Sequence, residues 1–421
     1  MKMRILVPSS IIDVTGEIQA CLSLAKQQGF DIDNIELGVS PTQLVELVFL
    51  HSATTISSDI ISTDLYDSNH QLRYQEGTFL DSNIKRDNVV HLSIEDQGAS
   101  LDVWCHPLNG EVRALSSERA ITKVQRTKHF AWVITLLALD FPIEDSLTLA
   151  RAQLNVSRET WASEYSLFPI PVLEHSKLGI ATEWSFEGSV TSNNALPFGL
   201  LSKESLGLYP VVDDIAWIER LLALGVTTIQ LRIKNSQQAD LEHQIVQAIE
   251  LGKQYQAQVF INDYWQLAIE HGAFGVHLGQ EDINETNLDE LAQANVRLGL
   301  STHGYYELLR ITQINPSYIA LGHIFPTTTK QMPSLPQGLV RLKLYQKLID
   351  TIPYGDDIGF PTVAIGGIDL TNANQVWQCG VSSLAVVRAV TLSDAPKSVV
   401  DAFAKVMSPV QRTESIAEVT P

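Results

Sequence analysis

The stretch from Gly322 to Lys330 combines residue types that suit the binding of phosphate. It reads Gly-His-Ile-Phe-Pro-Thr-Thr-Thr-Lys, so an apolar run stops at a proline and is followed by three hydroxyls and one ammonium. Hydroxyls, backbone N–H groups and a lysine gathered past a strand end are typical of phosphate or pyrophosphate sites. Three other polar clusters in the same half of the chain also follow strand-like runs, at 230–234, 261–263 and 277–282.

The first of these clusters alternates polar and apolar residues. Gln230, Arg232 and Lys234 are two residues apart, so they share one side of a strand and its exit. Arg offers a planar fork of donors and Lys a point charge, which together would form an anion clamp. The alternative interpretation is an ordinary solvated strand end.

Two carboxylates follow neighbouring strand-like runs, at Asp263 and Asp282. Carboxylates that converge from adjacent loops suit Mg²⁺, which takes oxygen ligands and keeps several waters. Helix capping is the competing role for Asp263, because a helix is expected to start near Trp265. Ser301, at the end of the next run, could equally hydrogen-bond a ligand or cap a helix. His277 lies among these residues, although a lone histidine is more often structural.

A Gly366-Gly367 pair closes a later apolar run. Phosphate sites in barrel enzymes recur in the loops after strands seven and eight. The glycine pair is weak evidence alone, because turns use glycine freely.

The elements that must position these residues alternate between strands and helices. Apolar runs predict strands at Leu206–Val212, Thr228–Ile233, Gln258–Asn262, Gly275–Leu278, Arg297–Ser301, Tyr318–Leu321, Thr362–Ile365 and Ser383–Val387. Amphipathic segments predict helices at Ile215–Leu224, Leu241–Tyr255, Leu288–Ala294, Leu339–Leu348 and Asn372–Cys379. Eight such units with short connections favour a (β/α)8 TIM barrel over an open doubly wound sheet. Active sites of barrels lie at the carboxyl ends of the strands, where every polar cluster falls.

The composition is that of a globular protein with ample core. The chain has 421 residues, of which 45% are hydrophobic and 18% charged, and no apolar run long enough for a membrane span. A net charge of −19 argues against nucleic acid as a partner. Three widely spaced cysteines show no metal-binding pattern, so we expect a reducing, cytoplasmic setting.

From about Leu206 to Phe403, the chain resembles thiamine phosphate synthases, which are barrel enzymes. The motifs that carry the resemblance are QLRxK at 230–234, ND at 262–263, GVHLGQxD at 275–282, Ser301, FPTxTK at 325–330 and IGGI at 365–368. The resemblance implies a transferase of thiamine biosynthesis. It would couple 4-amino-2-methyl-5-(diphosphooxymethyl)pyrimidine with thiazole phosphate to give thiamine phosphate and pyrophosphate.

The resemblance also implies a role for each matched residue. The pyrimidine diphosphate would be bound by Gln230, Arg232, Lys234, Asn262 and Lys330, with Ser301 on the pyrimidine. Mg²⁺ on the pyrophosphate would be held by Asp263 and Asp282. The thiazole phosphate would be held by Thr327, Thr329 and Gly367, helped by the backbone at Val387 and Arg388. The cations Arg232, Lys234 and Lys330 would be the catalytic residues, since they stabilise the leaving charge.

Two positions depart from the family pattern. His323 stands where a proline is more usual, and Arg388 where a serine is common. A thiazole tautomerase-like paralogue and a non-catalytic sensor of thiamine intermediates remain as alternatives. The intact Asp263/Asp282 pair and Lys330 favour the synthase over both.

The sequence as a whole predicts four segments: a smaller α/β domain at 1–170, a linker at 171–204, the barrel at 205–407 and a flexible tail at 408–421. A strand is expected at 5–8 and a helix at 17–28, followed near the end by two helices broken at Asp140–Pro142. These helices and the preceding strand pair, at 101–105 and 110–113, weakly resemble hydroxymethylpyrimidine kinases of the ribokinase type. The anion hole and catalytic Asp of that family are missing, and 126–129 reads Arg-Thr-Lys-His instead. The domain is thus either a non-catalytic remnant or an unrelated α/β domain, and it could contact other thiamine-pathway enzymes.

Overall fold

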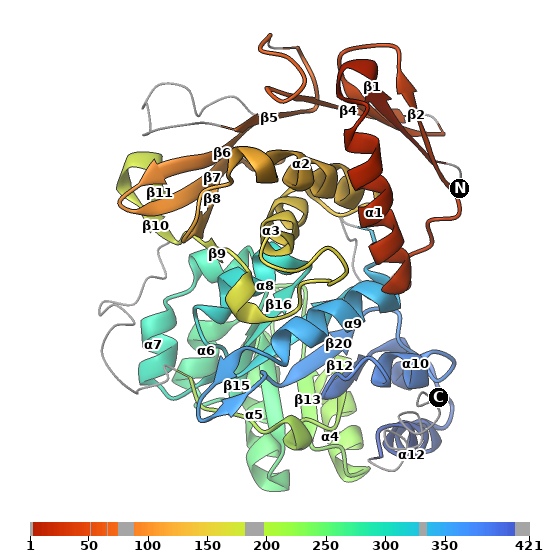
Figure 1. Cartoon of the computed structure of the whole chain (residues 1–421). Helices are drawn as coiled ribbons and strands as arrows, with labels where there is room; N and C mark the ends of the chain where they lie inside the picture. The colour runs from red at the N-terminus through yellow and green to blue at the C-terminus, as the bar shows by residue number, and fades with distance from the viewer. Residues whose placement is uncertain are drawn as a thin grey trace. The chain divides into compact units, whose positions relative to one another are not determined.

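The computed structural model describes residues 3–50, 52–64, 66–74, 88–181, 198–327 and 335–408. The chain forms two compact units, Met1–Thr182 and Glu183–Pro421. Figure 1 colours the first from red to yellow and the second from green to blue.

The N-terminal unit is built on a nine-stranded mixed sheet. Its strand order is β2-β1-β3-β4-β5-β6-β7-β8-β9, with parallel pairing of β1 to β2 and of β4, β5 and β6 in turn. The strands are β1 Met3–Pro8, β2 Ile35–Ser40, β3 Val45–Phe49, β4 Ser52–Ser58, β5 His70–Tyr74, β6 Val89–Asp96, β7 Ala99–Cys105, β8 Val112–Ser117 and β9 Ile170–Pro171. The strand expected at 5–8 and the strand pair β7–β8 are confirmed.

Among the described residues of this unit, three α-helices accompany the sheet: α1 Val14–Gln27, α2 Lys123–Ala138 and α3 Ile143–Gln153. The predicted break between the last two is confirmed, since Asp140 adopts a left-handed φ of +66° and Pro142 precedes α3. From His129 to Ala138 every residue of α2 is buried, as expected of a helix that is apolar all round.

The prediction that the linker begins at 171 was wrong. Strand β9 pairs with β8, and β10 (Glu174–His175) pairs with β11 (Ile180–Ala181) within the N-terminal unit. Leu178 and Ile180 are buried against the sheet residues Ile94 and Leu101, because these apolar side chains complete a small core there. On the other side of the undescribed residues 182–197, Leu201 already belongs to the core of the second unit.

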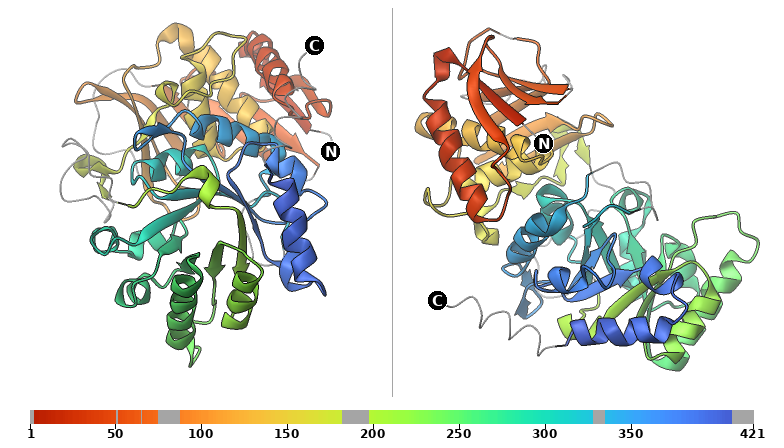
Figure 2. Two further views of the ribbon diagram at one scale, coloured as in Figure 1. Left: turned by 90° about the horizontal axis from the view of Figure 1, so that it is seen from below. Right: turned by 90° about the vertical axis from the view of Figure 1, so that its right-hand side faces the viewer.

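The second unit is a closed barrel of eight parallel strands, as predicted. In order these are β12 Leu208–Val212, β13 Thr228–Leu231, β14 Gln258–Asn262, β15 Gly275–Leu278, β16 Arg297–Thr302, β17 Tyr318–Gly322, β20 Thr362–Ile365 and β21 Ser383–Val386. Strand β21 closes the barrel on β12. Figure 2 shows this unit, coloured from green to blue, from two further directions. A small hairpin, β18 Pro353–Tyr354 with β19 Asp357–Ile358, precedes β20.

The helices of the barrel follow its strands. They are α4 Ile215–Ala223, α5 Leu241–Tyr255, α6 Trp265–Glu270, α7 Leu288–Gln293, α8 Tyr305–Thr312, α9 Gly338–Ile349, α10 Ala373–Trp377, α11 Arg388–Thr391 and α12 Pro396–Val406. The set of helices expected from the sequence lacked α8, α11 and α12, and seven of the eight residues of α8 are buried. Among the described residues, the helices are all too short or too polar to cross a bilayer.

Aromatic rings fill the barrel interior. Tyr209, Phe260 and Tyr318 are almost completely buried there, and the last two rings meet edge to face with centroids 5.1 Å apart. Two glycines on neighbouring strands leave the necessary room. A Cβ at Gly275 would overlap the Phe260 ring, and one at Gly299 would overlap the Tyr318 ring.

Candidate active site at the carboxyl ends of the barrel strands

Most of the predicted site residues lie at one end of the barrel. All eight strands are parallel, so their carboxyl ends meet on the same face. That end carries Gln230 on β13, Asn262 on β14, Ser301 on β16, and Asp263 and Asp282 in the loops after β14 and β15. The structure therefore brings together residues that are up to 71 positions apart in the sequence, from 230 to 301.

Gln230 and Asn262 form a buried pair. Gln230 Nε2 donates to Asn262 Oδ1 at 3.0 Å, and the two residues are 4% and 6% exposed. A solvated strand end is therefore excluded for Gln230. Arg232 is half-buried just past β13, and its backbone N–H donates to Val212 at 2.7 Å; Lys234 is exposed.

Asp263 sits on a strained backbone immediately after β14. Its φ is +68°, a left-handed conformation that asparagine and aspartate tolerate better than most residues. The N-cap residue of α6 is Tyr264 and not Asp263, so the capping alternative is not what the structure shows. Burial, followed by the charge of Asp263, raises the pKa of the Tyr264 hydroxyl.

Asp282 begins a 3-10 turn, Asp282–Glu285, after β15. Its Oδ2 accepts a hydrogen bond from the backbone N–H of Gly279 at 2.9 Å, which folds the loop back toward the strand end. Asp263 and Asp282 thus follow adjacent parallel strands and offer carboxylate oxygens, the donor type that Mg²⁺ prefers. The residues present fit such an ion.

Ser301 is held by a hydrogen-bonded chain that the sequence did not indicate. Its Oγ lies 2.8 Å from His277 Nε2, and His277 Nδ1 lies 2.7 Å from the hydroxyl of Tyr318. Tyr318 in turn contacts the hydroxyl of Tyr209 at 2.8 Å. The next helix, α8, has Gly304 as its N-cap, so Ser301 is not a helix cap. The sequence did offer one sign of this chain of hydrogen bonds: two strands that are otherwise apolar, β12 and β17, each contain a tyrosine, Tyr209 and Tyr318.

The Gly366-Gly367 turn follows β20 and packs closely on the loop after β17. Both glycines have positive φ values, +103° and +66°. Phe325 donates its backbone N–H to the carbonyl of Gly366 at 3.0 Å, and Asn372 Nδ2 donates to the carbonyl of Gly367 at 2.9 Å. A Cβ on Gly367 would lie 2.8 Å from Pro326 O, so only glycine fits this turn.

The remaining predicted phosphate residues follow strands β17 and β21 or lie outside the described part. Thr327 is half-buried in the loop after β17, whereas Thr329 and Lys330 fall outside the described residues. Val387 is half-buried and Arg388 exposed, directly after β21. His323, one of the two departures from the family pattern, is 6% exposed, and burial lowers the pKa of its imidazole.

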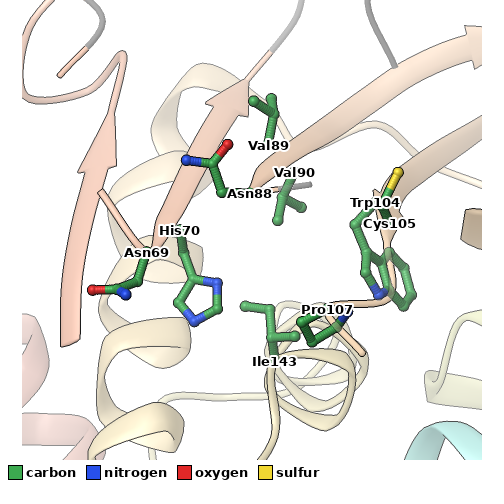
Figure 3. Close-up of a pocket in the computed structure, with 9 residues that line it drawn as sticks. All are labelled: Asn69, His70, Asn88, Val89, Val90, Trp104, Cys105, Pro107 and Ile143. Carbon is green, nitrogen blue, oxygen red and sulfur yellow. The ribbon is translucent and has the colours of Figure 1, made fainter. Parts of the chain in front are cut away.

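The N-terminal unit contains a separate small pocket with a volume of about 30 Å³. Figure 3 shows its lining, which includes His70, Trp104, Pro107 and Ile143. Burial lowers the pKa of His70 to about 4, so the imidazole is neutral at neutral pH. We assign no ligand to this pocket, because its lining is largely apolar and carries no cluster of charged groups.

Known proteins match the barrel. The family model for thiamine monophosphate synthase matches residues 208–390. A thiamine-phosphate synthase of Yersinia pestis is 58% identical over 192 residues, which are 46% of this chain and 86% of that protein. One from Proteus mirabilis is 56% identical over 190 residues, 45% of this chain and 85% of that protein. A solved thiamine phosphate pyrophosphorylase from Pyrococcus furiosus is 28% identical, covers 49% of this chain and 96% of its own, and has a TM-score of 0.42. Because the chain shares 58% and 56% identity with the Yersinia and Proteus proteins over most of their length, it belongs to the thiamine-phosphate synthase family.

Proposed function

We propose that this chain is a thiamine phosphate synthase that joins 4-amino-2-methyl-5-(diphosphooxymethyl)pyrimidine to thiazole phosphate. The observation that carries the proposal is the order of polar side chains around the barrel. Consecutive strands β13 to β16 end at or beside Gln230, Asn262, Asp282 and Ser301, in a chain 58% identical to curated synthases over the region they share.

The reaction needs a leaving group to depart and a nitrogen to attack. The bond between the methylene carbon and the diphosphate oxygen breaks, pyrophosphate leaves, and the thiazole nitrogen forms a bond to the same carbon. The amino-substituted pyrimidine can delocalise positive charge, so bond breaking can run ahead of bond making. No protein nucleophile is required, and orientation of the two substrates supplies much of the rate.

The chain's own residues would stabilise the charge that develops on pyrophosphate. Arg232 and Lys234 follow β13, and Lys330 follows the hydroxyl cluster; a cation aimed at the leaving oxygens acts most strongly in the transition state. Asp263 and Asp282 would hold Mg²⁺, which neutralises diphosphate charge when bound. The Gly366-Gly367 turn, with Thr327 beside it, would receive the thiazole phosphate.

The test is an assay of the purified full chain with both substrates and Mg²⁺. We expect thiamine phosphate and pyrophosphate to appear together in equal amounts. Omission of either substrate, or chelation of the metal, should abolish both products. A tautomerase-like paralogue or a sensor would release no pyrophosphate, so that result would reject the synthase. The N-terminal unit remains a candidate docking partner for other enzymes of the pathway.

A further inference from the structure

We propose that Tyr209 and Tyr318 fix the direction of the hydrogen bonds that end at Ser301, so that the Ser301 hydroxyl donates its proton to a ring nitrogen of the pyrimidine. Tyr209 and Tyr318 would then be positioning residues, acting through His277. This inference rests on the proposed function and goes further by stating which atom of the substrate Ser301 recognises.

The chain of contacts crosses the barrel interior on four strands. It runs from Tyr209 on β12 to Tyr318 on β17, then to His277 on β15 and Ser301 on β16, with all three steps between 2.7 and 2.8 Å. The imidazole also stacks on the Tyr318 ring, with centroids 5.7 Å apart and planes 21° apart. Tyr209 is 2% exposed and Tyr318 fully buried, so water does not compete for their hydroxyls.

The direction follows from counting protons. Burial raises the pKa of both phenols, so each keeps its single proton. Within the described residues, the only hydrogen-bond partner of the Tyr209 hydroxyl is Tyr318. A buried donor left unused is costly, so Tyr209 donates to Tyr318. Tyr318 must then give its own proton to His277 Nδ1, which is therefore the acceptor nitrogen of the ring.

The remaining steps settle the role of Ser301. With Nδ1 accepting from Tyr318, the imidazole of His277 carries its proton on Nε2 and donates it to Ser301 Oγ. The Ser301 proton is then left for a ligand. The reverse direction would use the Ser301 proton on His277 and leave the Tyr209 proton without an acceptor. Gln280 Nε2 donates to the Ser301 carbonyl at 2.7 Å, which fixes the backbone beside the hydroxyl.

If the Ser301 hydroxyl donates its proton, the atom of the substrate that it contacts must carry a lone pair. The ring nitrogens of an aminopyrimidine carry lone pairs, whereas its exocyclic amino group offers protons, so Ser301 reads a ring nitrogen. This hydrogen bond does not strengthen as positive charge grows on the ring. Its loss should therefore weaken substrate binding more than it slows the chemical step.

A glycine in the barrel wall leaves room for the Tyr318 ring and its hydrogen bonds. A Cβ at position 299 on β16 would overlap the Tyr318 ring, so Gly299 is needed for the Tyr318 hydroxyl to reach both of its partners, Tyr209 and His277. A purely space-filling ring would not need its hydroxyl. Tyr318→Phe therefore separates filling from hydrogen bonding.

The experiment combines the tautomer of His277 with steady-state kinetics on the full chain. Histidine is labelled with nitrogen-15, and the His277 signals are assigned by their loss in His277→Gln. We expect the wild type to carry the proton on Nε2. In Tyr318→Phe we expect a mixture of tautomers, and a KM for the pyrimidine diphosphate raised about 3- to 10-fold, the worth of one hydrogen bond, with kcat nearly unchanged. Tyr209→Phe should show a smaller shift of the same kind.

Tyr354→Phe is the matched control. It removes another buried phenol hydroxyl of this unit, which accepts from Leu201 N at 2.9 Å and donates to Ser317 O at 2.8 Å. It should leave the tautomer and KM unchanged. A wild-type His277 protonated on Nδ1, or an unchanged tautomer in both Tyr318→Phe and Tyr209→Phe, would overturn the proposal. Absence of turnover in the wild-type protein would instead reject the proposed function. The tautomer of His277 would still decide the direction of the hydrogen bonds from Tyr209 to Ser301.

Discussion

Gln230 donates a hydrogen bond to Asn262 across the neighbouring strands β13 and β14, with 3.0 Å between Nε2 and Oδ1. Both side chains are buried, so each amide is oriented by the other and not by water. The pair is thus arranged before any substrate arrives, which reduces the ordering that binding must supply.

Asn262→Ala should weaken binding of the pyrimidine diphosphate through its effect on Gln230. The substitution leaves a buried donor without its acceptor, a loss of about 1–3 kcal/mol that should also lower the free energy of unfolding. We expect Gln230→Ala and the double variant to raise KM to a similar extent, because residues in one hydrogen bond act together. Strictly additive effects on KM in this cycle would show that the two amides act independently.

Asp263→Asn and Asp282→Asn should each lower Mg²⁺-dependent turnover by about 10³ or more, since a lost carboxylate ligand removes several kcal/mol of charge stabilisation. Asparagine also tolerates the left-handed backbone at 263, so the fold should survive. Turnover is measured over a series of Mg²⁺ concentrations. Glu285→Gln, an exposed change on the same 3-10 turn as Asp282, is the control and should behave as wild type. Full activity in both aspartate variants would remove the metal assignment.

The barrel could be predicted because its strands are short apolar runs buried on both faces. Polar motifs lie at or just after several of these runs, so their spacing located the carboxyl ends of the strands to within a residue or two. The contact between Tyr209 and Tyr318 could not be predicted, because it joins residues 109 positions apart and exists only once the barrel closes. The same holds for the room left by Gly299.

The beginning of the linker was misplaced for a related reason. Residues 171–181 contain a proline, a glycine and the polar run 174–177, but Leu178 and Ile180 pack into a small core against the sheet of the N-terminal unit. Composition alone does not reveal such a distant partner. The kinase-like resemblance of this unit stays a prediction.

Gly367→Ala should weaken binding of thiazole phosphate. The new Cβ would meet Phe325 Cβ and Pro326 O at 2.8 Å, at a φ of +66° that alanine disfavours, so the turn must shift. Loss of one or two charge-assisted hydrogen bonds to phosphate should raise its KM about 10- to 100-fold. Gly380→Ala introduces comparable strain at a φ of +99° before β21. It should lower stability without changing KM, and an equal KM in the two variants would argue against the turn as the phosphate site.

The stability of the N-terminal unit should fall with pH below about 6.5. Burial lowers the pKa of His129 to about 3, whereas the unfolded chain titrates near the ordinary value of 6.5. Between these two values the unfolded state binds more protons, so each pH unit of acidification costs up to about 1.4 kcal/mol. Urea unfolding at pH 7 and pH 5 measures this slope, and His129→Gln should reduce it; His70, whose pKa burial lowers to about 4, accounts for the part that remains. His243→Gln, at an exposed position, should leave it unchanged. An equal slope in His129→Gln and wild type would contradict the assignment.

The barrel unit alone should retain synthase activity. A fragment of residues 183–421 keeps every matched motif, and it includes Leu201, whose backbone N–H is bound by Tyr354 and whose side chain fills the barrel core. A fragment that starts at 206 would lose these contacts and should be less stable. We expect kcat of the longer fragment within a few-fold of the full chain, measured in the same coupling assay. A well-folded but inactive fragment would show that the N-terminal unit completes the site.

The N-terminal unit should lack kinase activity. Where a kinase of the ribokinase type has its anion hole, helix α2 begins with a capping box in which Gln125 accepts from the Thr122 backbone N–H at 3.1 Å. His129 is fully buried there, 2.9 Å from the Tyr74 hydroxyl, and its lowered pKa keeps it uncharged. A neutral, buried imidazole supplies no charge to a transferred phosphate. The full chain is incubated with ATP and hydroxymethylpyrimidine, and we expect no phosphorylated pyrimidine. ATP-dependent product that survives Asp263→Asn, but is lost when residues 1–182 are removed, would place a working kinase in this unit and refute the remnant.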